Sequence, residues 1–100
     1  MDLGIKGKRA LVTGGATGIG KAIVLDLAKE GVQVAFTSRN KKDIEQTLKD
    51  LGNTKKNHLG ICTDLFEEGA ANSLADKVWK EFGQLDIVVN NIGHNLAWMT

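Results

Sequence analysis

The sequence predicts an α/β fold in which helices connect the strands of a parallel sheet. Four short apolar or alternating segments, typical of strands, recur along the 100 residues. Between them lie segments of about a dozen residues with apolar side chains at helical spacing, long enough to cross over between parallel strands. Right-handed crossovers are expected in such a sheet, and the strand order 3-2-1-4 would place the first and fourth strands side by side.

The first predicted element is a buried strand that runs into a glycine-rich turn. Residues 10–12 read ALV, an apolar run typical of a strand buried on both faces. Residues 13–20 read TGGATGIG, and we call them the glycine turn. Glycines allow positive φ angles and close backbone approach, and backbone N–H groups at a helix start can hold a phosphate. A flexible surface loop between two ordinary elements is the alternative.

Three amphipathic helices are expected, each with one inward stripe of apolar residues. The first ends at Gly31, the second is capped by Asn40, and the third spans residues 66–82 with two acids, at 67 and 68, in its first turn. The expected inward residues, helix by helix, are Ile19, Ala22, Ile23 and Leu27; Ile44, Leu48 and Leu51; and Ala70, Leu74, Val78 and Phe82.

The other predicted strands are residues 32–38, 59–63 and 85–90. The strand at 59–63 is the weakest of these because Gly60 lies inside it. The strand at 85–90 has the most convincing buried pattern after the first strand.

Composition excludes several classes of protein. A net charge of +1, from 13 basic and 12 acidic residues, gives no basis for a nucleic-acid or membrane partner. No apolar run approaches the ~18 residues of a membrane span, and the N-terminus lacks the apolar core of a signal peptide. A single cysteine, Cys62, excludes an intrachain disulfide. We therefore expect a cytoplasmic protein with a single domain over residues 1–100.

No metal site is predicted. His58, His94 and Cys62 lack the paired spacing of metal ligands. Cys62 is expected to be a small core residue, and His94 either faces a substrate or belongs to a loop.

Polar or glycine residues follow each predicted strand, at the sheet edge where ligands of such folds bind. These positions are residues 13–20, 38–39, 63–65 and 90–93. Ser38 and Arg39 stand where a fold selective for NAD would place a carboxylate near the ribose 2′-OH. A guanidinium there favours a 2′-phosphate instead, and a solvated arginine at a helix entrance is the alternative.

Two motifs resemble the short-chain dehydrogenase/reductase family. The glycine turn matches its T-G-x-x-x-G-x-G cofactor loop, and Asn90-Asn91-Ile92-Gly93 is similar to its Asn-Asn-Ala-Gly, with Ile92 in place of alanine. The resemblance implies the N-terminal half of a Rossmann-type doubly wound sheet, a dinucleotide-binding domain incomplete at the C-terminus. Arg39 then implies NADP(H) in preference to NAD(H), although Thr17 departs from the basic residue that many NADP-dependent members carry.

The resemblance also implies the residues that bind the cofactor. Asp64 would bind the adenine amino group with Leu65 close to the ring, while a cap for the helix after it is an equally good local role for Asp64. The implied cofactor-binding residues are Gly14, Gly15, Ala16, Thr17, Gly18, Ile19, Gly20, Ser38, Arg39, Asp64, Leu65, Asn91, Ile92 and Gly93.

The function implied by the resemblance is hydride transfer between NADP(H) and a carbonyl or alcohol substrate, in a full-length homo-oligomeric enzyme. The family's catalytic Ser and Tyr-x-x-x-Lys lie beyond the strand that ends at Asn90, and the sequence contains no tyrosine. We therefore assign no catalytic residue and expect the 100 residues alone to be inactive. The chain is then either a fragment of a longer enzyme or a truncated product.

The alternative function is a non-catalytic nucleotide-binding or interaction module made of the half-fold alone. The substrate stays open between fatty-acyl, steroid and sugar compounds.

Overall fold

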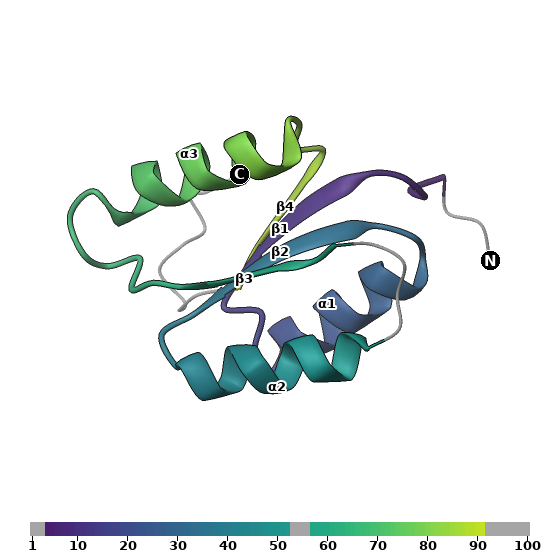
Figure 1. Cartoon of the computed structure of the whole chain (residues 1–100), viewed down its shortest axis with the longest axis horizontal. Helices are drawn as coiled ribbons and strands as arrows, with labels where there is room; N and C mark the ends of the chain where they lie inside the picture. Colours follow the sequence, from purple (N-terminus) through teal and green to yellow (C-terminus); the bar gives the residue numbers. More distant parts are fainter. Residues whose placement is uncertain (1–3, 53–56, 92–100) are drawn as a thin grey trace.

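A computed structural model describes residues 4–52 and 57–91 and confirms the α/β fold. In these residues the strands form one parallel sheet in the order β3-β2-β1-β4, the N-terminal half of a Rossmann-type sheet. Helices α1 and α2 cover one face of the sheet and α3 covers the other (Figure 1). The elements are β1 (Arg9–Thr13), α1 (Gly18–Lys29), β2 (Gln33–Ser38), α2 (Lys41–Leu51), β3 (Leu59–Cys62), α3 (Ala70–Phe82) and β4 (Ile87–Asn90).

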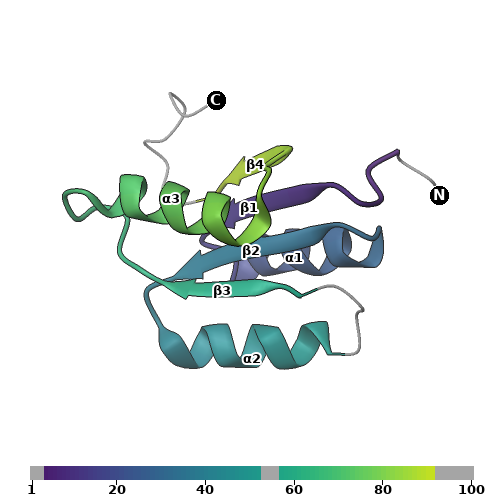
Figure 2. The same ribbon diagram turned by 45° about the horizontal axis from the view of Figure 1, so that its top comes forward.

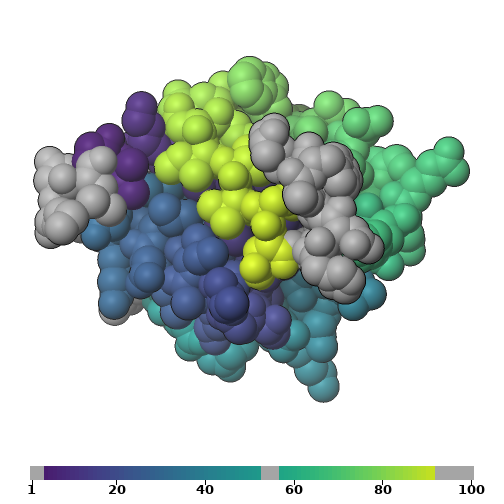
Figure 3. All heavy atoms as spheres, turned by 180° about the vertical axis from the view of Figure 1, so that it is seen from behind, coloured from purple at the N-terminus to yellow at the C-terminus, as the bar shows by residue number. Residues whose placement is uncertain are grey.

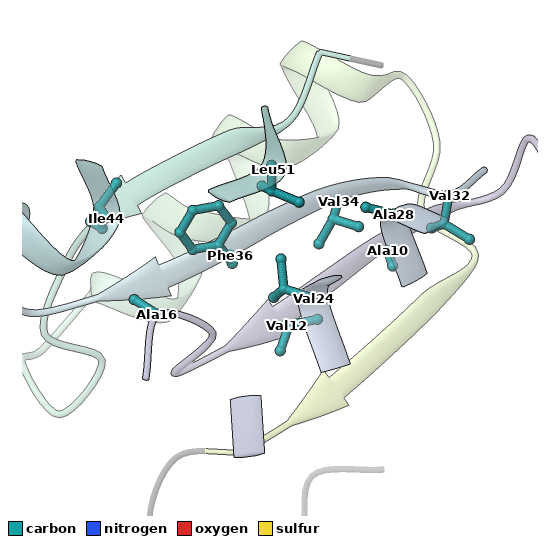
Figure 4. Packing of buried hydrophobic residues seen from close by; sticks show 10 residues of the cluster. All are labelled: Ala10, Val12, Ala16, Val24, Ala28, Val32, Val34, Phe36, Ile44 and Leu51. Atoms are coloured by element: carbon teal, nitrogen blue, oxygen red, sulfur yellow. The ribbon is translucent and has the colours of Figure 1, made fainter. Parts of the chain in front are cut away.

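The larger core cluster lies between the sheet and helices α1 and α2. Figure 4 shows the fully buried ring of Phe36 next to Ile44 and Leu51 of α2. In the same view Val24 of α1 lies next to Val12 of β1. This packing fixes both helices against the two central strands, whose carboxyl ends they flank.

The prediction of the inward face of α1 is confirmed for Ile23 and Leu27, which are partly buried and pack against the larger core cluster, and is wrong for Ile19 and Ala22. Gly20, Val24 and Ala28 are buried, whereas Ile19 is 73% exposed and Ala22 is also exposed. The helix lies so close to the sheet that small residues occupy the line of contact. A pattern built on large apolar side chains misses that line.

Helix α2 differs from its prediction at one position. Asn40 caps it as expected, with Oδ1 accepting from the backbone N–H groups of Lys42 and Asp43 at 2.9 and 3.4 Å. The buried stripe, however, includes Thr47 in place of Leu48, which is 38% exposed. A hydroxyl therefore lies inside the core, where it needs a hydrogen-bond partner.

The opposite face of the sheet is covered by α3, whose expected stripe is confirmed for its buried residues Leu74, Val78 and Phe82. The start of the helix was predicted too early. Residues 66–69 form turns, and α3 begins after Gly69, whose φ of 80° is left-handed. The acids at 67 and 68 consequently lie outside the helix.

Strand β4 is less buried than predicted. It begins at Ile87, and Val88 is 58% exposed. The parallel register pairs Val88 with Leu11, so its side chain lies on the face that α3 covers over the other strands. In Figure 3 residues at this end of the described chain, in yellow, lie at the molecular surface.

Strand β3 forms despite Gly60, and the structure explains the glycine. A Cβ at this position would overlap the Cγ2 of Ile44 and lie 3.2 Å from the ring of Phe36. Helix α2 therefore packs directly on the backbone of β3. The prediction that Cys62 belongs to the core was wrong, because the thiol is exposed and donates to the carbonyl oxygen of Arg39 at 3.7 Å.

Polar residues at the amino ends of the strands bind one another, and we call them the amino-end cluster. Arg9 donates from Nε to the Gln33 side chain at 3.0 Å and from Nη1 to the carbonyl oxygen of Phe82. Its backbone N–H donates to Asp86 Oδ2 at 2.9 Å, and the N–H of Asp86 donates to the Arg9 carbonyl at 2.8 Å. The cluster joins β1, β2, the end of α3 and the segment before β4.

Among the described residues, none of the helices combines the length and the apolar character that crossing a membrane requires.

Candidate functional site

The glycine turn leaves β1 in a conformation that requires glycine at two positions. Gly14 and Gly18 have φ angles of 69° and 56°, in the left-handed region where a Cβ is unfavourable. Two other glycines provide space. A Cβ on Gly15 would lie 2.7 Å from Phe36 Cβ, and one on Gly20 would overlap the Gly14 carbonyl oxygen and lie 2.5 Å from Asn91 Nδ2. The turn therefore lies directly against β2 and β4.

Two buried threonines hold the turn from neighbouring elements. Thr37 of β2 accepts the N–H of Gly14 on its hydroxyl and the N–H of Gly15 on its carbonyl, both at 3.0 Å. The hydroxyl of Thr47 in α2 donates to the carbonyl oxygen of Ala16 at 3.3 Å. Both threonines are nearly inaccessible to solvent, at 1% and 0% exposed. Bonds within the protein thus set the backbone of the turn.

The end of β4 adds a third support. Thr13 donates its hydroxyl proton to Asn90 Oδ1 at 2.8 Å and accepts the N–H of Asn91 at 3.1 Å. Asn91 Nδ2 then donates to the Gly14 carbonyl oxygen at 3.3 Å. Segments nearly 80 residues apart are joined beside the turn by these bonds, since Thr13 and Asn90 are separated by 77 positions.

A cavity of about 470 Å³ lies at this edge of the sheet. Figure 2 shows the strand arrows of the sheet pointing toward this end. The residues of the described chain that line it come from the glycine turn, the end of β2, the start of α2 and the segments after β2, β3 and β4: Gly14, Ala16, Thr17, Thr37, Ser38, Arg39, Asn40, Asp43, Thr63, Asp64, Leu65, Phe66 and Asn91.

The predicted site residues divide into three groups. Eight line the cavity: Gly14, Ala16, Thr17, Ser38, Arg39, Asp64, Leu65 and Asn91. Gly15, Gly18, Ile19 and Gly20 do not line it but belong to the turn or to the first turn of α1. Ile92 and Gly93 lie outside the described residues, as does His94.

Arg39 stands exposed at the rim of the cavity. In residues 4–52 and 57–91 the single ion pair joins Lys21 to Asp50, so no ion pair involves the Arg39 guanidinium there. The residues on either side of Arg39 are held in place: Ser38 Oγ accepts the N–H of Asn40 at 3.0 Å, and the Ser38 carbonyl accepts the N–H of Thr63 at 2.9 Å. The cation is thus available to an anionic ligand.

Asp64 has the local role that the sequence suggested, though not at a helix. Its Oδ1 accepts the N–H of Phe66 at 3.0 Å, and its carbonyl accepts the N–H of Glu67 at 3.1 Å. Because α3 starts only at Ala70, the carboxylate stabilises a turn on the cavity wall.

Among the described residues, the two carboxyl groups with clearly shifted pKa values lie away from the cavity. Hydrogen bonds from Lys21 and Gln46 hold the pKa of Asp50 below its usual range. The Arg9 backbone N–H and the Gln84 side chain do the same for the pKa of Asp86. Within the described residues, no group of three or more His, Cys, Asp or Glu side chains could hold a metal ion. The cavity wall carries the Arg39 cation, amide and hydroxyl groups and the glycine turn, which suit a phosphorylated ligand. It also carries the carboxylates of Asp43 and Asp64, which can accept hydrogen bonds from donor groups of such a ligand.

Sequence reasoning missed several residues of the site. Thr37 and Thr47 gave no signal beyond a polar residue in an element with an apolar face. Asn40 was predicted as a helix cap only, and its place on the cavity wall follows from that cap. Phe66 was assigned to a helix that begins four residues later.

Comparisons with known proteins agree with this geometry. A family model described as "short chain dehydrogenase" matches residues 8–100. "Probable 2,4-dienoyl-CoA reductase 3" of Caenorhabditis elegans is 41% identical over 104 residues, covering 99% of this chain and 33% of that protein. "NADPH-dependent aldehyde reductase 1, chloroplastic" of Arabidopsis thaliana is 38% identical over 94 residues, covering 87% and 33%.

Solved structures are also similar. L-sorbose reductase from Gluconobacter frateurii, complexed with NADPH and L-sorbose, superimposes with a TM-score of 0.87 and 33% identity, covering 94% of this chain and 36% of that chain. The chain thus spans about a third of the length of the curated relatives it matches.

Proposed function

We propose that this chain, which belongs to the short-chain dehydrogenase/reductase family, binds NADP(H) for an oxidoreductase. The observation that carries the proposal is that residues of the glycine turn and Arg39 line the same cavity. The turn suits a pyrophosphate, and the guanidinium suits a further phosphate on the ribose.

The residues present fit such a dinucleotide. A Cβ at Gly20 would overlap the Gly14 carbonyl oxygen, so only glycine leaves α1 starting this close to the turn. The first N–H groups of a helix have no acceptor within it. We assign those of Gly18, Ile19 and Gly20 to the pyrophosphate, with Gly15, Ala16 and Thr17 shaping the turn that leads to them.

Arg39 and Ser38 are proposed to bind the ribose 2′-phosphate. The guanidinium has no ion pair within the described residues, and a phosphate would neutralise it by paired N–H donation. A relative named as NADPH-dependent and a similar structure complexed with NADPH support the choice of NADP(H) over NAD(H).

The remaining predicted residues are proposed to hold the two ends of the cofactor. Asp64 and Leu65 line the cavity where the adenine would lie, and Asn91 lies beside the glycine turn. Ile92 and Gly93, which follow it in sequence, are assigned to the same side of the cofactor. When bound, the nicotinamide supplies or accepts the hydride.

The substrate of the whole protein is proposed to be a carbonyl or alcohol compound. Carbonyl reduction also needs a proton donor, and the family's tyrosine is not found among these 100 residues. We therefore propose that these residues bind cofactor without catalysing the reaction, and that a longer cytoplasmic protein, a homo-oligomer, supplies the donor.

The test is cofactor selectivity in the full-length protein after the substitution Arg39→Asp. Losing a charge-assisted phosphate contact costs about 1.5–3 kcal/mol, and the new carboxylate also repels the 2′-phosphate. NADPH affinity should therefore fall far more than NADH affinity in titrations at fixed salt.

Lys41→Asp is the matched control, because it makes the same change of charge two residues away and does not line the cavity. It should leave the ratio of the two affinities close to that of the wild type. An equal loss for both cofactors in Arg39→Asp contradicts the proposed role.

A further inference from the structure

Phe66 is an exposed aromatic residue on the wall of the otherwise mostly polar cavity. Its side chain is 68% exposed, and it belongs to neither core cluster. Other large apolar side chains are also exposed, among them Trp79 on α3 and Val88 on β4. In the described chain Phe66 differs from those two because it lines the cavity.

The backbone around Phe66 is held in place without using its ring. Asp64 accepts the N–H of Phe66 on Oδ1 at 3.0 Å and the N–H of Glu67 on its carbonyl at 3.1 Å. The N–H of Thr63 donates to the Ser38 carbonyl at 2.9 Å, which ties this segment to the residue before Arg39. Phe66 and Arg39 are therefore presented to the same cavity from adjoining strand ends.

An exposed ring at a fixed place in a binding cavity suits a flat partner. Aromatic side chains stack on the face of a nucleobase whatever its hydrogen-bonding pattern, because every base has a π face. The neighbouring Asp64 carboxylate is an acceptor for an exocyclic amino group. Phosphate groups or a sugar alone would leave the Phe66 ring in water.

We propose that Phe66 forms the stacking surface for the purine base of the dinucleotide. The inference rests on the proposed function and adds to it a residue that sets affinity for the adenosine half. Phe66 contacts the base, while Arg39 contacts the phosphate on the same ribose. The two residues thus divide the recognition of adenosine 2′-phosphate.

The probe is 2′,5′-ADP, which carries the base and the 2′-phosphate but no nicotinamide. In the full-length protein, Phe66→Ala should weaken both 2′,5′-ADP and NADPH by the same factor, about five- to tenfold. Phe66→Tyr keeps the ring and should retain affinity close to that of the wild type. Since the ring is mostly exposed, Phe66→Ala should leave the midpoint of urea denaturation nearly unchanged.

Trp79→Ala is the matched control, because Trp79 is 61% exposed and lies outside the cavity wall. It should not change the affinity for either ligand. If Phe66→Ala binds 2′,5′-ADP as tightly as the wild type, the stacking role is wrong. A loss of NADPH affinity alone would also overturn it, because the ring would then face the nicotinamide half.

Failure of the proposed function gives a different result. If the wild-type protein bound neither NADPH nor 2′,5′-ADP, both the function and this inference would be refuted. If the wild type bound both ligands and Phe66→Ala did so equally well, only the inference would fail.

Discussion

The two ends of the sheet use polar side chains in opposite ways. At the amino ends, Arg9 and its partners Gln33 and Asp86 bind one another and close that end of the sheet. At the carboxyl ends, Thr37 and Thr47 bind the backbone of the glycine turn. Thr37 itself lines the cavity, and so does Ala16, the hydrogen-bond partner of Thr47.

The difference shows how one fold separates stability from binding. Side chains of the amino-end cluster are satisfied by the protein itself, so they have little capacity left for a ligand. At the carboxyl ends the protein satisfies the loop backbone and leaves the Arg39 guanidinium without an ion pair in the described residues. Substitutions at the amino ends should therefore change stability alone, whereas substitutions at the carboxyl ends should change both stability and ligand binding.

The largest effect, counting stability and binding together, is expected for Gly20→Ala. A Cβ there would overlap the Gly14 carbonyl oxygen, so α1 must move away from the turn. Without that clash, alanine in a helix would stabilise the protein by up to about 1 kcal/mol relative to glycine. We expect instead a loss of about 1–3 kcal/mol in urea denaturation, together with a loss of NADPH affinity.

Ala22→Val is the control for this substitution, because it enlarges an exposed residue of the same helix. It should change the stability by less than about 1 kcal/mol. A Gly20→Ala protein that is more stable than the wild type would show that α1 does not lie this close to the turn.

The second effect concerns the amino-end cluster. Arg9→Met removes the side-chain donors to Gln33 and to the Phe82 carbonyl, and leaves that carbonyl oxygen without its charged partner. We expect a loss of about 1.5–3 kcal/mol in the free energy of unfolding and no change in NADPH affinity. Lys77→Met, at an exposed position of α3, should have little effect on either measurement. Weaker NADPH binding in Arg9→Met would contradict the separation of the two ends.

Thr47 should affect both measurements, by smaller amounts. Thr47→Val has nearly the same shape but leaves the Ala16 carbonyl oxygen without the hydroxyl at 3.3 Å. We expect a loss of about 1 kcal/mol in stability and a several-fold loss in NADPH affinity, because Ala16 lines the cavity. Thr47→Ser keeps the hydroxyl and should keep the affinity even if stability falls. Equal affinities in the valine and serine variants would mean that the hydrogen bond does not position the turn.

The smallest effect is a pH dependence from Asp86. The Arg9 backbone N–H lowers the pKa of this carboxyl below its ordinary value of 3.8 in the folded protein. The ionised carboxylate therefore stabilises the fold above the unfolded pKa, and this contribution is lost as the pH falls through the lower, folded pKa. The stability difference between wild type and Asp86→Asn should shrink on acidification below 3.8. A difference that stays constant down to acid unfolding would argue against a role for the charge.

The sequence predicted the order of elements well because apolar periodicity reports which residues leave water. The prediction failed where a helix packs so closely on the sheet that small residues, and not large apolar ones, are the buried ones. The inward line of α1 consists of Gly20, Val24 and Ala28, and the larger Ile19 lies outside it. Similarly, Gly60 weakened the prediction of β3 although its missing side chain is what lets Ile44 pack there.

The candidate site was predictable where a side chain suited to a ligand directly follows a strand, as Arg39 follows β2. It was not predictable where a residue acts through its partner. In the sequence Thr47 is only a polar residue of an amphipathic helix. In the structure its hydroxyl donates to the carbonyl oxygen of Ala16. Phe66 was predicted to begin the third helix, whereas α3 begins after the left-handed Gly69 and Phe66 lies on the cavity wall.

Thr37 binds the backbone of both Gly14 and Gly15, and this has a consequence for the thermodynamics of ligand binding. Fixing the backbone of one residue costs roughly 1–2 kcal/mol of conformational entropy. In this protein the glycine turn loses that conformational entropy when the chain folds, because the buried Thr37 restrains its backbone. A ligand that enters meets a preorganised receptor, so calorimetry should find little entropy loss from ordering the turn. In Thr37→Val the turn would be less ordered before the ligand binds, so the entropy of binding should become more unfavourable.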